Sequence, residues 1–98
     1  MAVKQRREKM QENDMLWEEE ILVELYVPAS GQEWDVWIPA GRTVEELEKE
    51  LGILAERLDP GNVSCEGSLL VNRDTGMPYP TGNLAYEVFR NGSRLMII

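Results

Sequence analysis

The sequence of 98 residues contains no histidine and only one cysteine, Cys65. Histidine is the commonest general base and metal ligand near neutral pH, so its absence removes the usual basis of an enzymatic or metal site. A cysteine without a histidine partner is not a recognisable nucleophile pair, and a single cysteine excludes an internal disulfide. We therefore expect no catalytic residues and no metal.

Long apolar runs and phosphate-binding loops are also lacking. No apolar stretch approaches the ~20 residues of a transmembrane helix, and no glycine-rich loop follows a strand into a helix to hold a phosphate. The first nine residues include basic side chains but no apolar run after them, unlike a secretory signal. These absences predict a cytoplasmic protein that needs no cofactor and has no stable membrane insertion.

Positive charge is scarce: the sequence has 10 Lys and Arg residues and 18 Asp and Glu residues, which gives a net charge of −8. Residues 1–13 hold four basic and two acidic side chains, a net charge of +2, so the remainder carries −10. An acidic body repels phosphate backbones, so we expect no nucleic-acid partner. We expect residues 1–19 to form a charged arm, frayed or helical, and residues 20–98 to fold as one domain.

The apolar pattern of the domain begins with a hairpin and a helix. Residues 20–27 and 33–38 alternate as strands do, and Pro28-Ala29-Ser30-Gly31 between them has turn chemistry. Thr43 followed by Glu46 is a capping box that opens a helix with one apolar stripe. Asp59-Pro60-Gly61 ends this helix.

Two further strands and a helical turn complete the order. Residues 68–72 and 94–98 are apolar enough to be strands, and residues 83–89 have the spacing of a short helical turn. The first and last strands are both strongly apolar, so we expect them to lie side by side at the centre. The predicted fold class is α+β: a mixed sheet of four to five strands with one amphipathic helix packed on one face, the β-grasp arrangement.

Over residues 20–98 this pattern resembles ubiquitin and its relatives. The opening hairpin, the capped helix, Leu69-Leu70-Val71 before a turn, the helical turn at Asn83-Leu84-Ala85-Tyr86 and the closing strand after Asn91-Gly92 carry the resemblance. Within that superfamily the chain is similar to the small YukD- and EsaB-type ubiquitin-like proteins of bacterial type VII (WXG100, ESX) secretion. The resemblance implies a cytoplasmic accessory or regulatory role, exercised by docking to a protein partner such as a type VII secretion component.

The resemblance to ubiquitin suggests conjugation to other proteins, but the last residues of the sequence argue against it. Ubiquitin-like modifiers are attached through a flexible tail that ends in Gly-Gly, whereas Leu95-Met96-Ile97-Ile98 reads as a strand. Freeing a carboxylate here would withdraw Leu95 and Ile97 from the core, at ~1.5–3 kcal/mol for each side chain. We therefore expect a protein that is not conjugated.

The sheet face away from the helix is the predicted partner-binding surface. With Val23, Trp34, Val36, Leu69 and Leu95 pointing inward, the alternation of strands sends six side chains outward: Leu22, Tyr26, Trp37, Leu70, Met96 and Ile98. Large exposed apolar patches mark interaction sites, and ubiquitin's use of the equivalent face supports Leu70, Met96 and Ile98.

In two alternatives to partner binding, the open sheet face is covered. The arm could fold over it through Met15, Leu16 and Trp17, or a homodimer could bury it. The alternative function is therefore a small structural homo-oligomer that pairs through its open sheet face or an edge.

Overall fold

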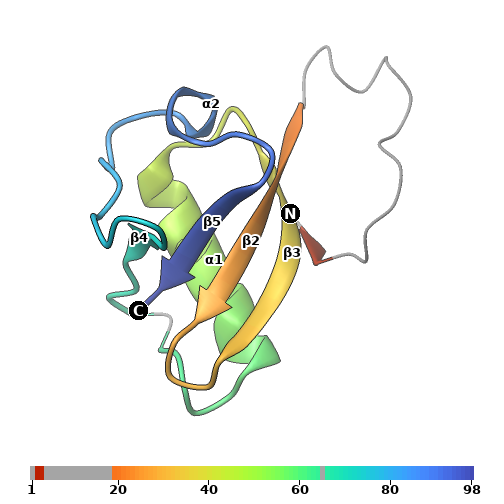
Figure 1. Ribbon diagram of the computed structural model, residues 1–98, viewed down its shortest axis with the longest axis vertical. Coiled ribbons are helices and arrows are strands. Elements are labelled where there is room, and N and C mark those ends of the chain that lie inside the picture. The colour runs from red at the N-terminus through yellow and green to blue at the C-terminus, as the bar shows by residue number, and fades with distance from the viewer. Residues whose placement is uncertain (1, 4–18, 65) are drawn as a thin grey trace.

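The computed structural model describes residues 2–3, 19–64 and 66–98. One sheet and one long helix dominate the molecule (Figure 1). The elements in chain order are β1 (Ala2–Val3), β2 (Glu20–Val27), β3 (Gln32–Pro39), α1 (Val44–Leu58), β4 (Leu70–Asn72), α2 (Ala85–Val88) and β5 (Ser93–Ile97). Helix α1 lies behind the sheet in Figure 1, so it covers one face only. The predicted α+β class and β-grasp arrangement are confirmed.

The strand order is β1-β3-β2-β5-β4. Strands β2 and β3 form the antiparallel hairpin, with Val23 opposite Val36, and Gly31 closes the turn at a φ of 79° that favours glycine. Strands β2 and β5 are parallel neighbours at the centre, with Leu25 beside Leu95. The predicted pairing of the first and last strands of the domain is therefore confirmed.

Helix α1 begins at the predicted capping box. The Thr43 hydroxyl accepts a hydrogen bond from the Glu46 amide at 3.1 Å, and the Glu46 carboxylate accepts one from the Thr43 amide at 3.0 Å. The hydrogen bond from the Thr43 amide stabilises the charged carboxylate and lowers the pKa of Glu46 below its ordinary value. The apolar stripe that follows packs on the sheet, and Val44, Leu47, Leu51 and Ala55 are fully buried.

An acidic side chain of the same helix is buried against the sheet. Glu48 is only 9% exposed, and its Oε2 accepts a hydrogen bond from the Leu70 amide at 3.1 Å. A buried amide without a partner is costly, so this contact satisfies the first amide of β4.

The predicted charged arm falls mostly outside the described residues, as do Cys65 and the apolar residues Met15, Leu16 and Trp17. Its Ala2–Val3 segment forms β1, which pairs antiparallel to β3 with Ala2 opposite Trp37. This strand was not predicted from the sequence pattern. The division of the chain into residues 1–19 and 20–98 stays a prediction.

Candidate docking surface on the open face of the sheet

The face of the sheet that α1 does not cover is called here the open face (Figure 1). Strand alternation decides which side chains reach it. Along β2, every second residue from Ile21 to Val27 is buried, and the residues between them are half-buried. The register places Leu22 beside Trp37, and Tyr26 beside Met96.

Four of the six predicted binding residues keep accessible surface on the open face. Leu22, Tyr26 and Met96 are half-buried, and Ile98 is 58% exposed. The alternation of β2 and β5 brings them to the same side of the sheet. A partner-binding role for them stays a prediction.

The expectation that Leu70 points outward is wrong. Leu70 is 0% exposed and lies opposite Ile97, on the face that packs against α1. Its neighbour Leu69, which was expected to point inward, is 37% exposed. The reason is the register of β4 against β5, which places Leu70 opposite the buried Ile97 and Leu69 beside Ile98. Leu70 therefore belongs to the core and not to a docking surface.

The expectation that Trp37 is an exposed anchor is also wrong. Its position in β3 matches the open face, but Trp37 is only 7% exposed. It has a strand on each side, because Leu22 of β2 and Ala2 of β1 are its two neighbours across the sheet. The large ring therefore has little surface accessible to a partner.

The open face also carries an arginine that sequence reasoning missed. Arg73 follows β4 at one edge of the sheet, and its guanidinium lies 3.9 Å from the centre of the Tyr26 ring. Its Nη1 donates a hydrogen bond to the Glu33 Oε2 at 3.0 Å. Because β5 lies between β4 and β2, the side chain of Arg73 crosses β5 to reach both partners. It covers part of the predicted apolar patch.

A second arginine connects two further carboxylates beside it. Arg94 of β5 places Nε 3.6 Å from the Glu24 Oε1 and Nη1 3.0 Å from the Asp74 Oδ1. Exposed ion pairs of this kind contribute at most ~1 kcal/mol each. The two arginines and their three carboxylate partners form what we call the arginine belt: Arg73, Arg94, Glu24, Glu33 and Asp74.

On one side of the belt lies an apolar group with two exposed members, one half-buried member (Met96) and one buried member (Val71), called here the apolar edge: Leu69, Val71, Met96 and Ile98. Leu69 and Ile98 face each other through two backbone hydrogen bonds of 3.0 and 3.1 Å, and Val71 pairs with Met96. Leu69 and Ile98 are the accessible members. Once the register of β4 is known, strand alternation is enough to place Leu69 on the open face.

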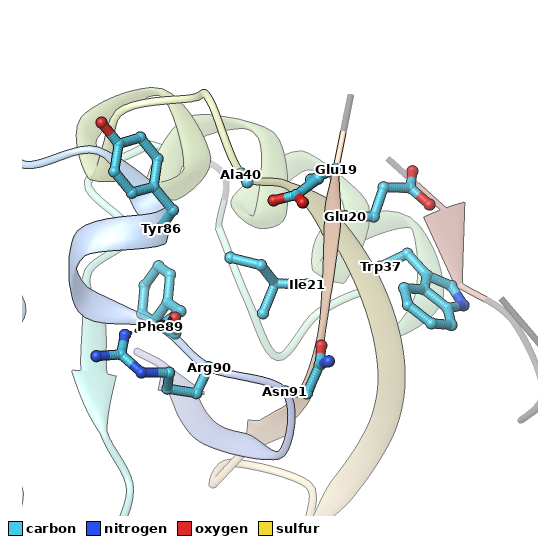
Figure 2. A pocket seen from close by; sticks show the side chains of 9 residues that line it. All are labelled: Glu19, Glu20, Ile21, Trp37, Ala40, Tyr86, Phe89, Arg90 and Asn91. Atoms are coloured by element: carbon cyan, nitrogen blue, oxygen red, sulfur yellow. Dashed lines mark hydrogen bonds between the residues drawn. The ribbon is translucent and has the colours of Figure 1, made fainter. Parts of the chain in front are cut away.

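At the opposite end of β2 a pocket of about 520 Å³ opens beside the open face (Figure 2). Its floor is apolar and buried, with Ile21, Ala40 and Phe89 all under 9% exposed. Backbone hydrogen bonds hold its walls: the Ala40 amide donates to the Glu19 carbonyl at 2.9 Å, and the Tyr86 amide donates to the Ala40 carbonyl at 3.1 Å. The pocket was not predicted, because three distant segments build it.

These groups are suited to binding: accessible apolar side chains, guanidinium groups and carboxylates. Among residues 2–3, 19–64 and 66–98, no group of three His, Cys, Asp or Glu side chains could hold a metal ion. Over the same described residues, no helix is long and apolar enough to span a membrane.

No family model matches the chain, and no curated protein sequence matches it. Several solved structures do. The ubiquitin-like domain of the Mycobacterium tuberculosis type VII secretion protein EccD1 has a TM-score of 0.60 at 14% identity, over 82% of this chain and 98% of that domain. A chain of the ESX-5 inner membrane complex has a TM-score of 0.58 at 20% identity.

The match to the ESX-5 complex covers 81% of this chain but 20% of that one, so this chain spans a fifth of its length. The ubiquitin-like domain of Plasmodium falciparum Dsk2 has a TM-score of 0.53 at 25% identity, over 82% of this chain and the whole of that domain. Similarity to ubiquitin-like domains thus extends beyond secretion proteins. The chain has the ubiquitin-like β-grasp fold, and its structural neighbours include the ubiquitin-like domains of type VII secretion proteins.

Proposed function

We propose that this chain is a non-catalytic, ubiquitin-like interaction module that acts as an accessory or regulatory component of a bacterial type VII secretion system in the cytoplasm. It binds a protein partner without being conjugated to it. The observation that carries the proposal is a β-grasp sheet whose open face ends in exposed apolar side chains.

The apolar edge is the part of that face best suited to a protein partner. Ile98 and Leu69 are exposed although both are large and apolar, and their backbones are fixed to each other by two hydrogen bonds. Exposed apolar groups on a rigid support gain binding free energy by leaving water, with little loss of conformational entropy. This supports docking by this edge.

The assignment to type VII secretion is supported by solved structures of secretion-system domains that have a similar fold. Ubiquitin-like domains of EccD1 and of Mycobacterium xenopi EccD5 are similar to it in structure, at TM-scores of 0.60 and 0.56. We infer that the partner is another component of such a secretion system.

The test is a pair of substitutions with a matched control. Ile98→Asp and Leu69→Asp place a charge in the apolar edge, and Ile53→Asp does the same on the outer side of α1, where the side chain is 45% exposed. The chain and its variants would be co-expressed with the components of a type VII secretion system and used to capture them. We expect the first two variants to lose the secretion component and Ile53→Asp to retain it.

Equal capture by all three variants would contradict docking at the apolar edge. Recovery of the chain alone, with a concentration-dependent dimer in light scattering that Ile98→Asp abolishes, would establish the alternative homo-oligomer. Intact mass spectrometry of the chain isolated from cells tests conjugation, because a covalently attached protein would appear as added mass.

A further inference from the structure

The exposed turn that precedes β5 is joined to β2 by two hydrogen bonds. The Asn91 Oδ1 accepts one from the Leu22 amide at 2.8 Å, and the Gly92 amide donates one to the Leu22 carbonyl, also at 2.8 Å. Figure 2 shows Asn91 beside β2. Both the N–H and the C=O of Leu22 are therefore bonded to this turn.

The side chain of Asn91 continues the pairing of the two central strands. Regular pairing of β2 with β5 begins one residue later, where Val23 lies beside Ser93. At Leu22 the carboxamide oxygen of Asn91 supplies the acceptor that a backbone carbonyl would supply in a regular ladder. The start of the central parallel pair thus depends on an intact asparagine side chain.

This asparagine stands in the sequence context in which deamidation is easiest. Deamidation begins when the backbone nitrogen of the next residue attacks the side-chain Cγ, and glycine hinders this attack least because it has no side chain. Asn91 is the only asparagine in the sequence that precedes a glycine. Gly92 has a φ of 92°, in the region that favours glycine, so the turn itself requires this neighbour.

The reaction needs only water and a base. The base takes the Gly92 amide proton, the nitrogen forms a bond with the Asn91 Cγ, and the Cγ–Nδ2 bond breaks. The leaving group departs as ammonia, with that proton returned to it, and a cyclic imide remains. Water then opens the ring. Cleavage between nitrogen and Cγ gives aspartate, and cleavage between nitrogen and the main-chain carbonyl carbon gives isoaspartate.

The two hydrogen bonds to Leu22 oppose this reaction in the folded chain. The Leu22 carbonyl holds the Gly92 amide proton, so the nitrogen is a poor nucleophile until that bond opens. The Leu22 amide holds the Asn91 Oδ1, which keeps Cγ from turning toward the Gly92 nitrogen. Exposed segments open locally at a lower free energy than the core, so the turn can separate from β2 without global unfolding.

We propose that Asn91 is a site of spontaneous deamidation, that it reacts when its turn separates from Leu22, and that the isoaspartate product weakens the start of the β2–β5 pair. Isoaspartate lengthens the main chain by one carbon before Gly92, so the turn no longer fits β2. Aspartate leaves the backbone unchanged and keeps an acceptor for the Leu22 amide. This modification goes beyond the proposed docking function and does not depend on it.

The test follows deamidation by peptide mass spectrometry at mildly alkaline pH. The full chain is incubated with and without urea, beside a capped peptide of residues 88–95, and chromatography separates the aspartate and isoaspartate products. In urea we expect Asn91 to react faster than Asn62, Asn72 and Asn83. In the folded chain Asn91 should react at least about tenfold more slowly than in the peptide, because two hydrogen bonds must open first.

A pair of serine variants tests the local opening. The Ser93 hydroxyl accepts a hydrogen bond from the Arg90 amide at 2.9 Å within the turn, whereas the Ser68 hydroxyl donates to the Ser64 carbonyl at 2.6 Å in another loop. Ser93→Ala should speed deamidation of the folded chain several-fold and leave the rate of the matching peptide unchanged. Ser68→Ala should change neither rate.

The product is tested against Asn91→Asp, which adds the same charge without lengthening the backbone. The isoaspartate chain is prepared in urea, separated by ion exchange and refolded. It should melt roughly 5 °C or more below Asn91→Asp, with amide shifts at Leu22 and Ser93 in the ¹⁵N-labelled chain. Asn91→Asp should melt close to the wild type.

Four outcomes would overturn the proposal. These are a folded chain that reacts as fast as the peptide or faster, another of the three asparagines that reacts faster than Asn91 in urea, an unchanged rate in Ser93→Ala, and an isoaspartate chain as stable as Asn91→Asp. None of them involves the apolar edge, so the docking function holds or fails separately, through the Ile98→Asp and Leu69→Asp variants.

Discussion

Two adjacent leucines with opposite environments provide the sharpest test of the structure. Leu70 is 0% exposed and packed in the core, whereas Leu69 is 37% exposed on the open face. Replacing a fully buried leucine by alanine removes its transfer free energy and leaves a cavity, at about 2–5 kcal/mol. A domain of this size has a free energy of unfolding of roughly 5–15 kcal/mol, so Leu70→Ala should lose a large part of it. Leu69→Ala should cost less than about 1 kcal/mol.

Urea unfolding followed by tryptophan fluorescence or circular dichroism measures both variants under the same conditions. For a domain of this size each kcal/mol corresponds to about 4–8 °C in melting temperature, so Leu70→Ala should melt roughly 10 °C or more below the wild type. Similar losses for the two variants, or a larger loss for Leu69→Ala, would refute the register of β4 and return Leu70 to the open face.

Other contacts give predictions of the same kind. Arg73→Ala should cost about 1 kcal/mol in urea unfolding, and less in a Tyr26→Leu background, whereas additive losses would argue against the stacking of these two side chains. Glu48→Ala leaves the buried amide of β4 without its acceptor and should cost about 1–3 kcal/mol, while Glu48→Gln, which keeps a carbonyl oxygen, should cost less. Thr43→Ala should remove about 1 kcal/mol of helix capping by the same measurement. Because the capping box lowers the pKa of Glu46, its stabilisation is complete above the ordinary glutamate pKa and is lost as the pH falls through the lowered value. Glu46→Gln should therefore show a smaller loss of stability on acidification, and an unchanged acid limb would contradict this.

The parts of the fold that local patterns encode were predictable. Thr43 and Glu46 are three residues apart, and the helix begins where they predict. The alternation in β2 and β3 identified Val23 and Val36 as core residues, and both are fully buried. The pairing of β2 with β5 followed from the apolar character of both strands. Each of these inferences depends on residues close in sequence or on a strong periodic signal.

The errors fall where the local pattern is ambiguous. At the start of β4, Leu69, Leu70 and Val71 follow one another, and an alternating pattern accommodates either register. The choice depends on the pairing of β4 with β5, which places Leu70 opposite Ile97, 27 positions later in the chain. Arg73 and Glu33 are separated by 40 residues, and no spacing rule brings them together. The open face could therefore be predicted as a candidate docking surface, but which side chains lie on it depends on the register of the strands.

The arginine belt changes how a partner can approach the open face. A side chain that binds the Tyr26 ring must first displace the Arg73 guanidinium, which lies 3.9 Å above it and is also held by Glu33. That displacement costs about 1 kcal/mol before any new contact forms. The pocket lies at the start of β2, and the exposed Leu69 and Ile98 lie past Met96, the neighbour of Tyr26, towards the other end of β2, so both places offer apolar surface without this cost. Recognition should therefore begin at these two ends, and the central residues of the predicted patch contribute only to partners that can replace the arginine.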